Sequence, residues 1–197
     1  MKKKLTLVVS LLLVMALSIG GTLAYLTAET EAVTNTFTFG NINITLTETD
    51  EDNVFDGLVP GAKVAKDPVV TVVSGSEECY VFVKIEEANN SAGDGEKYIN
   101  WAVDTANWEA VEGETGVYKY KTTVDASSAA QELYVLQPGD SGTDYENGYV
   151  TVDGENVTKE YIDNLTQNTY PKLTITAYAV QSEGMTDAAD AWAKAGF

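Results

Sequence analysis

The sequence predicts an all-β protein, built as an antiparallel, jelly-roll-like β-sandwich with short peripheral helices. Three segments, residues 67–75, 79–87 and 172–184, are rich in β-branched and aromatic residues and are bounded by turn-forming residues, which is typical of strands. Pro-Gly turns at residues 60–61 and 138–139 punctuate the chain between such segments. Several short strands at this spacing, joined by polar turns, favour a sandwich.

The first 24 residues predict a secretory signal peptide. Three lysines at positions 2–4 precede an apolar run from Leu5 to Ile19, and small residues place the cleavage between Ala24 and Tyr25. The apolar run is shorter than the roughly 20 residues that span a membrane, so an uncleaved transmembrane anchor is the less favoured interpretation. We therefore expect a secreted protein, in the extracellular matrix or at the cell surface, without membrane attachment after cleavage by a signal peptidase.

Residues 25–35, which we call the donor segment, separate the cleavage site from the first clear strand. Strand alternation divides its side chains between two faces. Leu26, Ala28, Thr30 and Ala32 share one face, and Tyr25 and Val33 share the other with two glutamates. The segment is only weakly apolar, so it suits an ordinary first strand, a loose tail or a strand given to another molecule. Two features favour the last: water solvates it at little cost, and it becomes free only after export.

The predicted domain covers residues 36–197. A period-two pattern over residues 36–47 predicts a half-buried strand pair or one bent strand, with a bulge near Gly40. Further strands are expected within residues 116–124, 130–137 and 147–154. Two short helices are expected, one capped by Thr158 and one that starts at Thr186 or Asp187 and ends at Gly196, with Trp192 packed on the sandwich.

The charge and the residue inventory exclude several function classes. The chain has twelve lysines, no arginine and thirty acids, so the mature form, with nine lysines, carries a net charge near −21. Such a surface repels nucleic acids, although it can attract cations such as calcium. Histidine is absent, which excludes the usual Ser-His-Asp, Cys-His and His-based zinc sites. We expect no enzyme activity and no cofactor, and the single cysteine, Cys79, is expected to be a core residue.

Two other kinds of site remain open at this point. Acidic clusters lie at residues 48–52 and 144–147, but neither has EF-hand spacing, so solvated loops are favoured over calcium sites. Aromatic residues in the segment 98–110 can form a platform for a sugar, or can cap one end of the sandwich. The platform residues are Tyr98, Trp101 and Trp108.

Several stretches together resemble the TasA/camelysin family of exported proteins from Gram-positive bacteria. These are KKKLTLVVSLLLVMALSIGGTLAYLT, NTFTFGNINITLTE, VPGAKVAKDPVVTV, YVFVKIE and ITAYAVQSEGMTDAADAW. Each stretch is weak alone, and the combination of Gly-Gly-Thr-Leu-Ala-Tyr with Asn-Thr-Phe-Thr-Phe-Gly-Asn is the more specific feature. The pieces extend along nearly the whole chain.

The resemblance implies a jelly-roll domain and a secreted structural subunit of extracellular biofilm-matrix fibres. It implies donor-strand complementation, in which the freed N-terminal segment of one subunit completes a sheet of the next in a head-to-tail polymer. Other matrix proteins are then possible partners. The alternatives are a secreted carbohydrate- or surface-binding β-sandwich module and, ranked last because the chain lacks histidine, a camelysin-type metallopeptidase.

Overall fold

The structure, a computed structural model, describes residues 41–49, 59–166 and 168–197. The chain divides into two units, Met1–Phe39 and Gly40–Phe197, and every described residue belongs to the second. The expected signal peptide, the Ala24–Tyr25 cleavage site and the donor segment lie outside the described residues. Within the described residues, no helix is long and apolar enough to cross a membrane.

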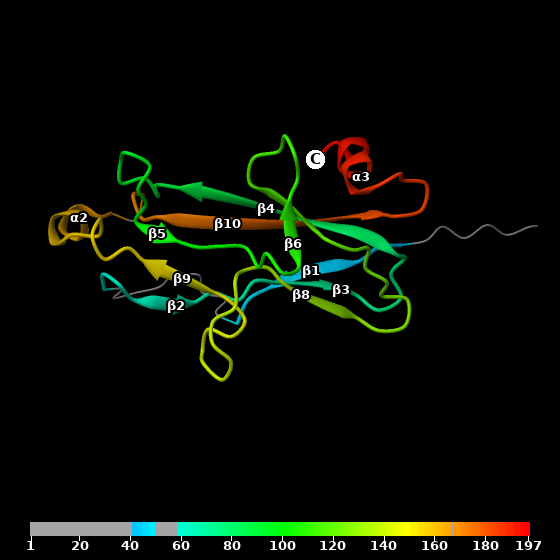
Figure 1. The fold of residues 1–197 in the computed structure, drawn as a ribbon, viewed down its shortest axis with the longest axis horizontal. Coiled ribbons are helices and arrows are strands. Elements are labelled where there is room, and N and C mark those ends of the chain that lie inside the picture. Colours follow the sequence, from blue (N-terminus) through cyan, green and yellow to red (C-terminus); the bar gives the residue numbers. More distant parts are fainter. Residues whose placement is uncertain (1–40, 50–58, 167) are drawn as a thin grey trace, which may run out of the picture. The chain divides into compact units, whose positions relative to one another are not determined.

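Three antiparallel sheets and two short helices make up the described part of the chain, which confirms the mostly-β, antiparallel class (Figure 1). One sheet has the order β1-β3-β8, with bounds Ile44–Thr47, Val69–Val72 and Gln131–Tyr134. The largest has the order β10-β4-β7-β6, with bounds Lys172–Gln181, Cys79–Ala88, Val117–Tyr120 and Trp108–Ala110. The third has the order β2-β9-β5, with bounds Lys63–Ala65, Tyr149–Val152 and Ile99–Asn100.

The long β4–β10 pair organises the domain. The two strands pair over ten residues, from Lys172 opposite Ala88 to Gln181 opposite Cys79, and the two smaller sheets lie one after the other along them (Figure 1). The core lies between the sheets, where β-branched residues from both sides are almost completely buried. Its members include Val70, Val72, Val81, Val83, Leu133 and Val150.

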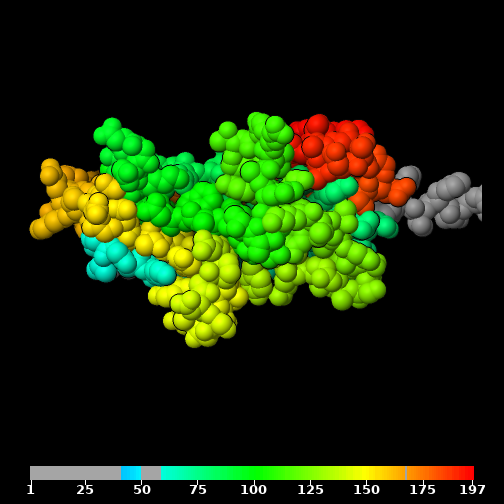
Figure 2. Space-filling view, in the orientation of Figure 1, coloured from blue at the N-terminus to red at the C-terminus, as the bar shows by residue number. Residues whose placement is uncertain are grey.

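A second, aromatic cluster covers part of the outer face of the largest sheet. Helix α3 (Ala188–Ala195) begins at its N-cap Asp187 and ends at Gly196, which adopts the left-handed conformation. Trp192 packs on Phe82 with ring centroids 5.1 Å apart, as expected. Figure 2 shows this helix, in red, beside the green β6–β7 connection. Helix α2 (Lys159–Asn164) likewise follows its predicted cap, Thr158.

Three short strands are absent from the sequence prediction. β2, β5 and β6 have only two or three residues each, too few for alternation to be recognised. They form because longer strands already offer partners: β2 and β5 flank β9, and β6 flanks β7. The expected turn at Pro60-Gly61 is present, with the N–H of Ala62 donating to the carbonyl of Val59 and Gly61 at φ +81°.

Cys79 is a core residue, as expected. It is fully buried at the start of β4 and forms no disulfide. Burial, with a smaller contribution from the Glu78 charge, raises the pKa of its thiol to about 11. The thiol therefore stays protonated and unreactive at neutral pH.

Two glycines in the β6–β7 connection provide a test of this packing. Gly113 and Gly116 both have positive φ, but a Cβ at Gly116 would meet the carbonyl oxygen of Ile85 at 2.5 Å, while a Cβ at Gly113 would meet nothing within 4 Å. Gly113→Ala should cost about 1 kcal/mol of unfolding free energy from backbone strain alone. Gly116→Ala should cost roughly 3 kcal/mol, because β7 must also move away from β4. Chemical denaturation of both variants measures the difference, and equal losses would contradict this packing.

Candidate functional site: an open sandwich edge

The outer edge of β10 carries a row of backbone groups without partners among the described residues. The N–H groups of Ile85 and Cys79 donate to Gly116 and Val124, away from β10. In an antiparallel pair, the residues opposite them therefore also point their N–H and C=O groups away from the pair. Register then assigns the same direction to every second residue of β10. These residues are Leu173, Ile175, Ala177, Ala179 and Gln181.

Strand β1 presents a shorter edge of the same kind in the facing sheet. Val73 donates to the carbonyl of Asn43, so Ile44 and Leu46 direct their N–H and C=O groups outward. β1 and β10 lie near each other, so the two outer edges flank one side of the sandwich. We call this side the β1–β10 edge.

Apolar side chains along the β1–β10 edge are only half-buried. Leu173, Ile175, Ala177 and Ala179 pack against the core from β10 but remain partly exposed, as do Ile42 and Ile44 near β1. Leu46 is 36% exposed. A strand added along this side would pair with the free backbone groups and cover these side chains together.

The opposite side of the sandwich is partly covered. The indole Nε1 of Trp108 donates to the carbonyl of Tyr134 at 2.8 Å, which satisfies one outward carbonyl of β8. Just beyond that strand, the N–H of Asp104 donates to Val135, and the N–H of Gln137 donates to Ala102. The polypeptide therefore covers the C-terminal end of the β8 edge itself, whereas the β1–β10 edge has no such cover among residues 41–49, 59–166 and 168–197.

Polar contacts anchor the C-terminal end of β1. The ammonium of Lys66, itself buried, lies 2.5 Å from a carboxylate oxygen of Glu48. Thr49 donates to the carboxylate of Asp67 from both its N–H and its hydroxyl. These contacts tie the end of β1 to the β2–β3 connection, so β1 is a fixed wall of the candidate site.

The aromatic platform, the alternative to capping the sandwich, does not form, because Trp108 is only 1% exposed and its ring lies in the core. Tyr98 stacks on Tyr161 with ring centroids 3.7 Å apart. Trp101 is half-buried and donates its Nε1 to Glu87. An exposed platform position for Trp108 is therefore wrong. Burying its large apolar ring in the core is more favourable in free energy than leaving it in water. The expectation that these aromatics cap the sandwich fits Trp108 better.

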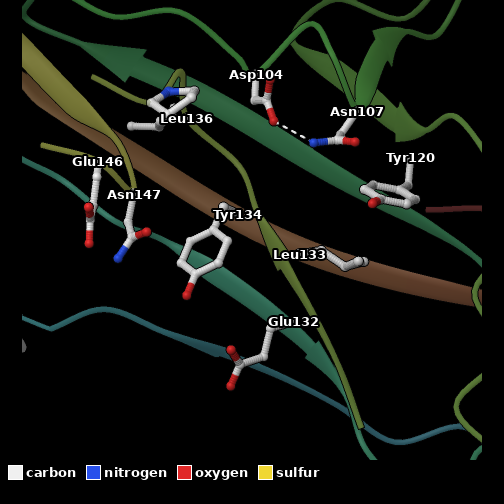
Figure 3. A pocket seen from close by; sticks show the side chains of 10 residues that line it. Asp104, Asn107, Tyr120, Glu132, Leu133, Tyr134, Leu136, Glu146 and Asn147 are labelled. Carbon is white, nitrogen blue, oxygen red and sulfur yellow. Dashed lines mark hydrogen bonds between the residues drawn. The ribbon is translucent and has the colours of Figure 1, made fainter. Parts of the chain in front are cut away.

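A shallow cavity of about 160 Å³ lies between β8, the turn after Val103 and the β8–β9 connection (Figure 3). The Asp104 carboxylate there accepts hydrogen bonds from Asn107 and from the N–H of Ala106, and Glu146 accepts from the N–H of Gly142. These acids are already used to fix turns, so the cavity is a weak candidate for catalysis. The β8–β9 connection around it projects from the domain (Figures 1 and 2).

The two expected acidic clusters provide no metal site that the structure describes. No group of three or more acids or cysteines in the described ranges is placed to hold a metal ion. Asp144, Glu146 and Asn147 lie in the projecting β8–β9 connection, and Asp50, Glu51 and Asp52 lie outside the described residues. Glu48, the remaining member, is paired with Lys66.

Comparison with known proteins adds no assignment: no family model and no curated protein matches this sequence. The resemblance to the TasA/camelysin family therefore depends on the sequence stretches quoted above.

The open edge predicts an alternating pattern of amide hydrogen exchange along β10 in the monomer. The N–H groups of Thr176 and Tyr178 point toward β4 and should be protected, whereas those of Ile175, Ala177 and Ala179 point away and should exchange faster. Residue-resolved exchange by NMR measures this directly. Uniform protection along the strand would mean that the monomer already covers this edge.

Proposed function

We propose that this chain is a secreted structural subunit of extracellular fibres, as in a biofilm matrix, and that it assembles by donor-strand complementation. The donor segment of one subunit, residues 25–35, adds as a strand to the β1–β10 edge of the next. The observation that carries the proposal is the ten-residue β10, which is paired along one side only among the described residues. The proposal involves no catalysis.

The donor segment has the composition that this edge requires. The outward backbone groups of Leu173, Ile175, Ala177 and Ala179 offer a ladder that spans seven residues, long enough for the greater part of the eleven-residue segment. One face of the segment carries Leu26 with alanines and a threonine, small enough to lie beside half-buried side chains. The other face carries glutamates, which remain in water. Alternation therefore allows the segment to cover apolar surface without burying a charge.

Head-to-tail donation gives an open polymer. A segment given to the next subunit and an edge that receives one from the previous subunit are different surfaces, so the contact is heterologous and does not close on itself. Before cleavage between Ala24 and Tyr25 the segment is continuous with the signal peptide. Under this proposal, the uncleaved signal peptide prevents assembly inside the cell, and its removal on export makes the donor segment available.

The direct test compares a chain covering Tyr25–Phe197 with one that starts at Asn35. Both are acidified and imaged, and we expect filaments from the longer chain only, because the shorter one has an acceptor edge but no donor. A synthetic peptide of residues 25–35 should bind the shorter chain, while a scrambled peptide should not. Filaments from both chains would refute the role of the donor segment.

A proline substitution separates assembly from folding. The N–H of Ala177 points outward, so Ala177→Pro removes a group needed for docking but no bond to β4. Thr176→Pro is the matched control, since it removes an N–H that points toward β4. We expect Ala177→Pro to remain folded, by its melting temperature, and to lose peptide binding, whereas Thr176→Pro should lose roughly 3 kcal/mol of stability. Normal peptide binding by folded Ala177→Pro would exclude β10 as the acceptor.

Acidification should promote assembly before it unfolds the domain. Four carboxylates have pKa values lowered by hydrogen bonds: Glu109 from Lys119, Asp125 from Ser127, Asp153 from the N–H groups of Asn156 and Glu155, and Asp190 from Lys194 and Thr186. Because these folded-state pKa values are depressed, their contribution to stability is present above the unfolded values and is lost only as pH falls through the lower folded ones.

Ordinary carboxylates, in contrast, take up protons near pH 4, which reduces the repulsion between acidic subunits. We therefore expect filaments to grow faster as pH falls toward about 4, while near-ultraviolet circular dichroism still reports the native fold. Added salt at neutral pH should act in the same direction through screening. Loss of the native spectrum at a higher pH than the onset of assembly would contradict this order of events.

A further inference from the structure

We propose that the outer face of the β1-β3-β8 sheet is the lateral contact surface between copies of this chain in neighbouring filaments. This inference rests on the proposed function, because it concerns the assembled filament. It assigns the association of filaments into bundles to one sheet face, which no element in the described ranges covers. The occupant of the face is the same face of a second copy.

Strand register defines the side chains of this face. Val70, Val72 and Leu133 point into the core, so the residues that alternate with them point outward. Cross-strand pairing arranges the outward residues in two rows. The rows are Thr45, Thr71 and Glu132, and Thr47, Val69 and Tyr134. Figure 3 shows Glu132 and Tyr134 projecting from β8 on the same side.

No described element covers this face, in contrast to the largest sheet, where α3 packs on the outer side of β4 and β10. Tyr134 is 37% exposed, and so is Val73, which directly follows β3. β-Branched and aromatic side chains of this kind pack well against a second pleated surface. Adding a donor strand to the β1–β10 edge extends a sheet within its plane, so the donor strand itself does not cover this face in a filament.

The low charge of the face favours a second copy of the chain as its partner. One of the six side chains is charged, Glu132, although the whole chain has thirty acids against twelve lysines. Two such acidic subunits repel each other over most of their surface, and this near-neutral face allows close approach at the least electrostatic cost. Because the face is nearly uncharged, it offers little to a strongly basic partner. Facing copies would place threonines, valine and tyrosine opposite one another.

The area of the face explains why single subunits stay apart while filaments associate. Three strands about 4.8 Å apart, each of four residues rising about 3.3 Å, present roughly 200 Å². A stable complex buries about 800 Å² on each partner. One face is therefore too small to hold a dimer, but a filament repeats it at every subunit, and the contacts then act together.

The experiment uses the chain from Tyr25 to Phe197 with three variants. Thr45→Glu adds a charge to the face at an exposed position on β1, where the backbone groups of Thr45 point toward β3 and not into the β1–β10 edge. Thr45→Gln has the same size without the charge, and Thr115→Glu places the charge in the exposed β6–β7 connection. Filament widths are measured by electron microscopy at low ionic strength, and the mass of the unassembled subunit is measured by light scattering at neutral pH.

We expect bundles from the parent chain, Thr45→Gln and Thr115→Glu, with loss of bundles but not of filaments in Thr45→Glu. High salt should restore bundling of Thr45→Glu, and unassembled parent subunits should be monomeric. Bundles of Thr45→Glu equal to the parent at low salt, or parent filaments that never associate, would overturn this inference and leave the proposed function intact. A parent chain that forms no filaments at all would overturn both.

Discussion

The long strand β10 dominates this structure because it is paired along only one of its sides by described residues. Its whole length is needed to hold β4, which carries the centre of the core. That pairing leaves every second N–H and C=O of β10 pointing away from the sheet, beside apolar side chains that the domain only half covers. Exposed edges of this kind are normally short, charged or covered. Here the opposite side of the sandwich is partly covered, by Trp108 and the chain around it, and this asymmetry is the reason we propose the β1–β10 edge as the acceptor.

Assembly through such an edge is expected to be conditional. Each backbone hydrogen bond contributes about 0.5–1.5 kcal/mol net, whereas ordering each residue of a loose segment costs on the order of 1–2 kcal/mol. Gains and costs are therefore of similar size, and modest changes in repulsion decide the outcome. Repulsion is strong because the mature chain has nine lysines against thirty acids. Six of these lysines form ion pairs with nearby acids, among them Lys66 with Glu48 and Lys119 with Glu109. Most acids are left for protons or dissolved cations to neutralise.

Alternating patterns in the sequence predicted the longer strands and both helix caps, because β-branched runs such as residues 79–87 and polar caps such as Thr158 act locally. The two- and three-residue strands β2, β5 and β6 depend on partners distant in the chain, so local patterns contain no signal for them. Trp108 shows the same limit: its neighbours are polar and turn-like, yet tertiary packing buries its ring and directs its Nε1 to Tyr134. The open edge of β10 could not be predicted from the sequence either. Alternation defines the two faces of a strand but not which of its two edges remains unpaired.

In the proposed assembly, the side of β10 that no described residue pairs receives the N-terminal segment of another subunit. Solid-state NMR on filaments grown from an equal mixture of ¹⁵N-labelled and ¹³C-labelled subunits tests this directly, because a nitrogen–carbon contact then joins two different molecules. We expect intermolecular backbone contacts between residues 25–35 and the stretch from Leu173 to Ala179. Contacts of residues 25–35 that occur only within one molecule, in uniformly labelled subunits diluted with unlabelled ones, would contradict it.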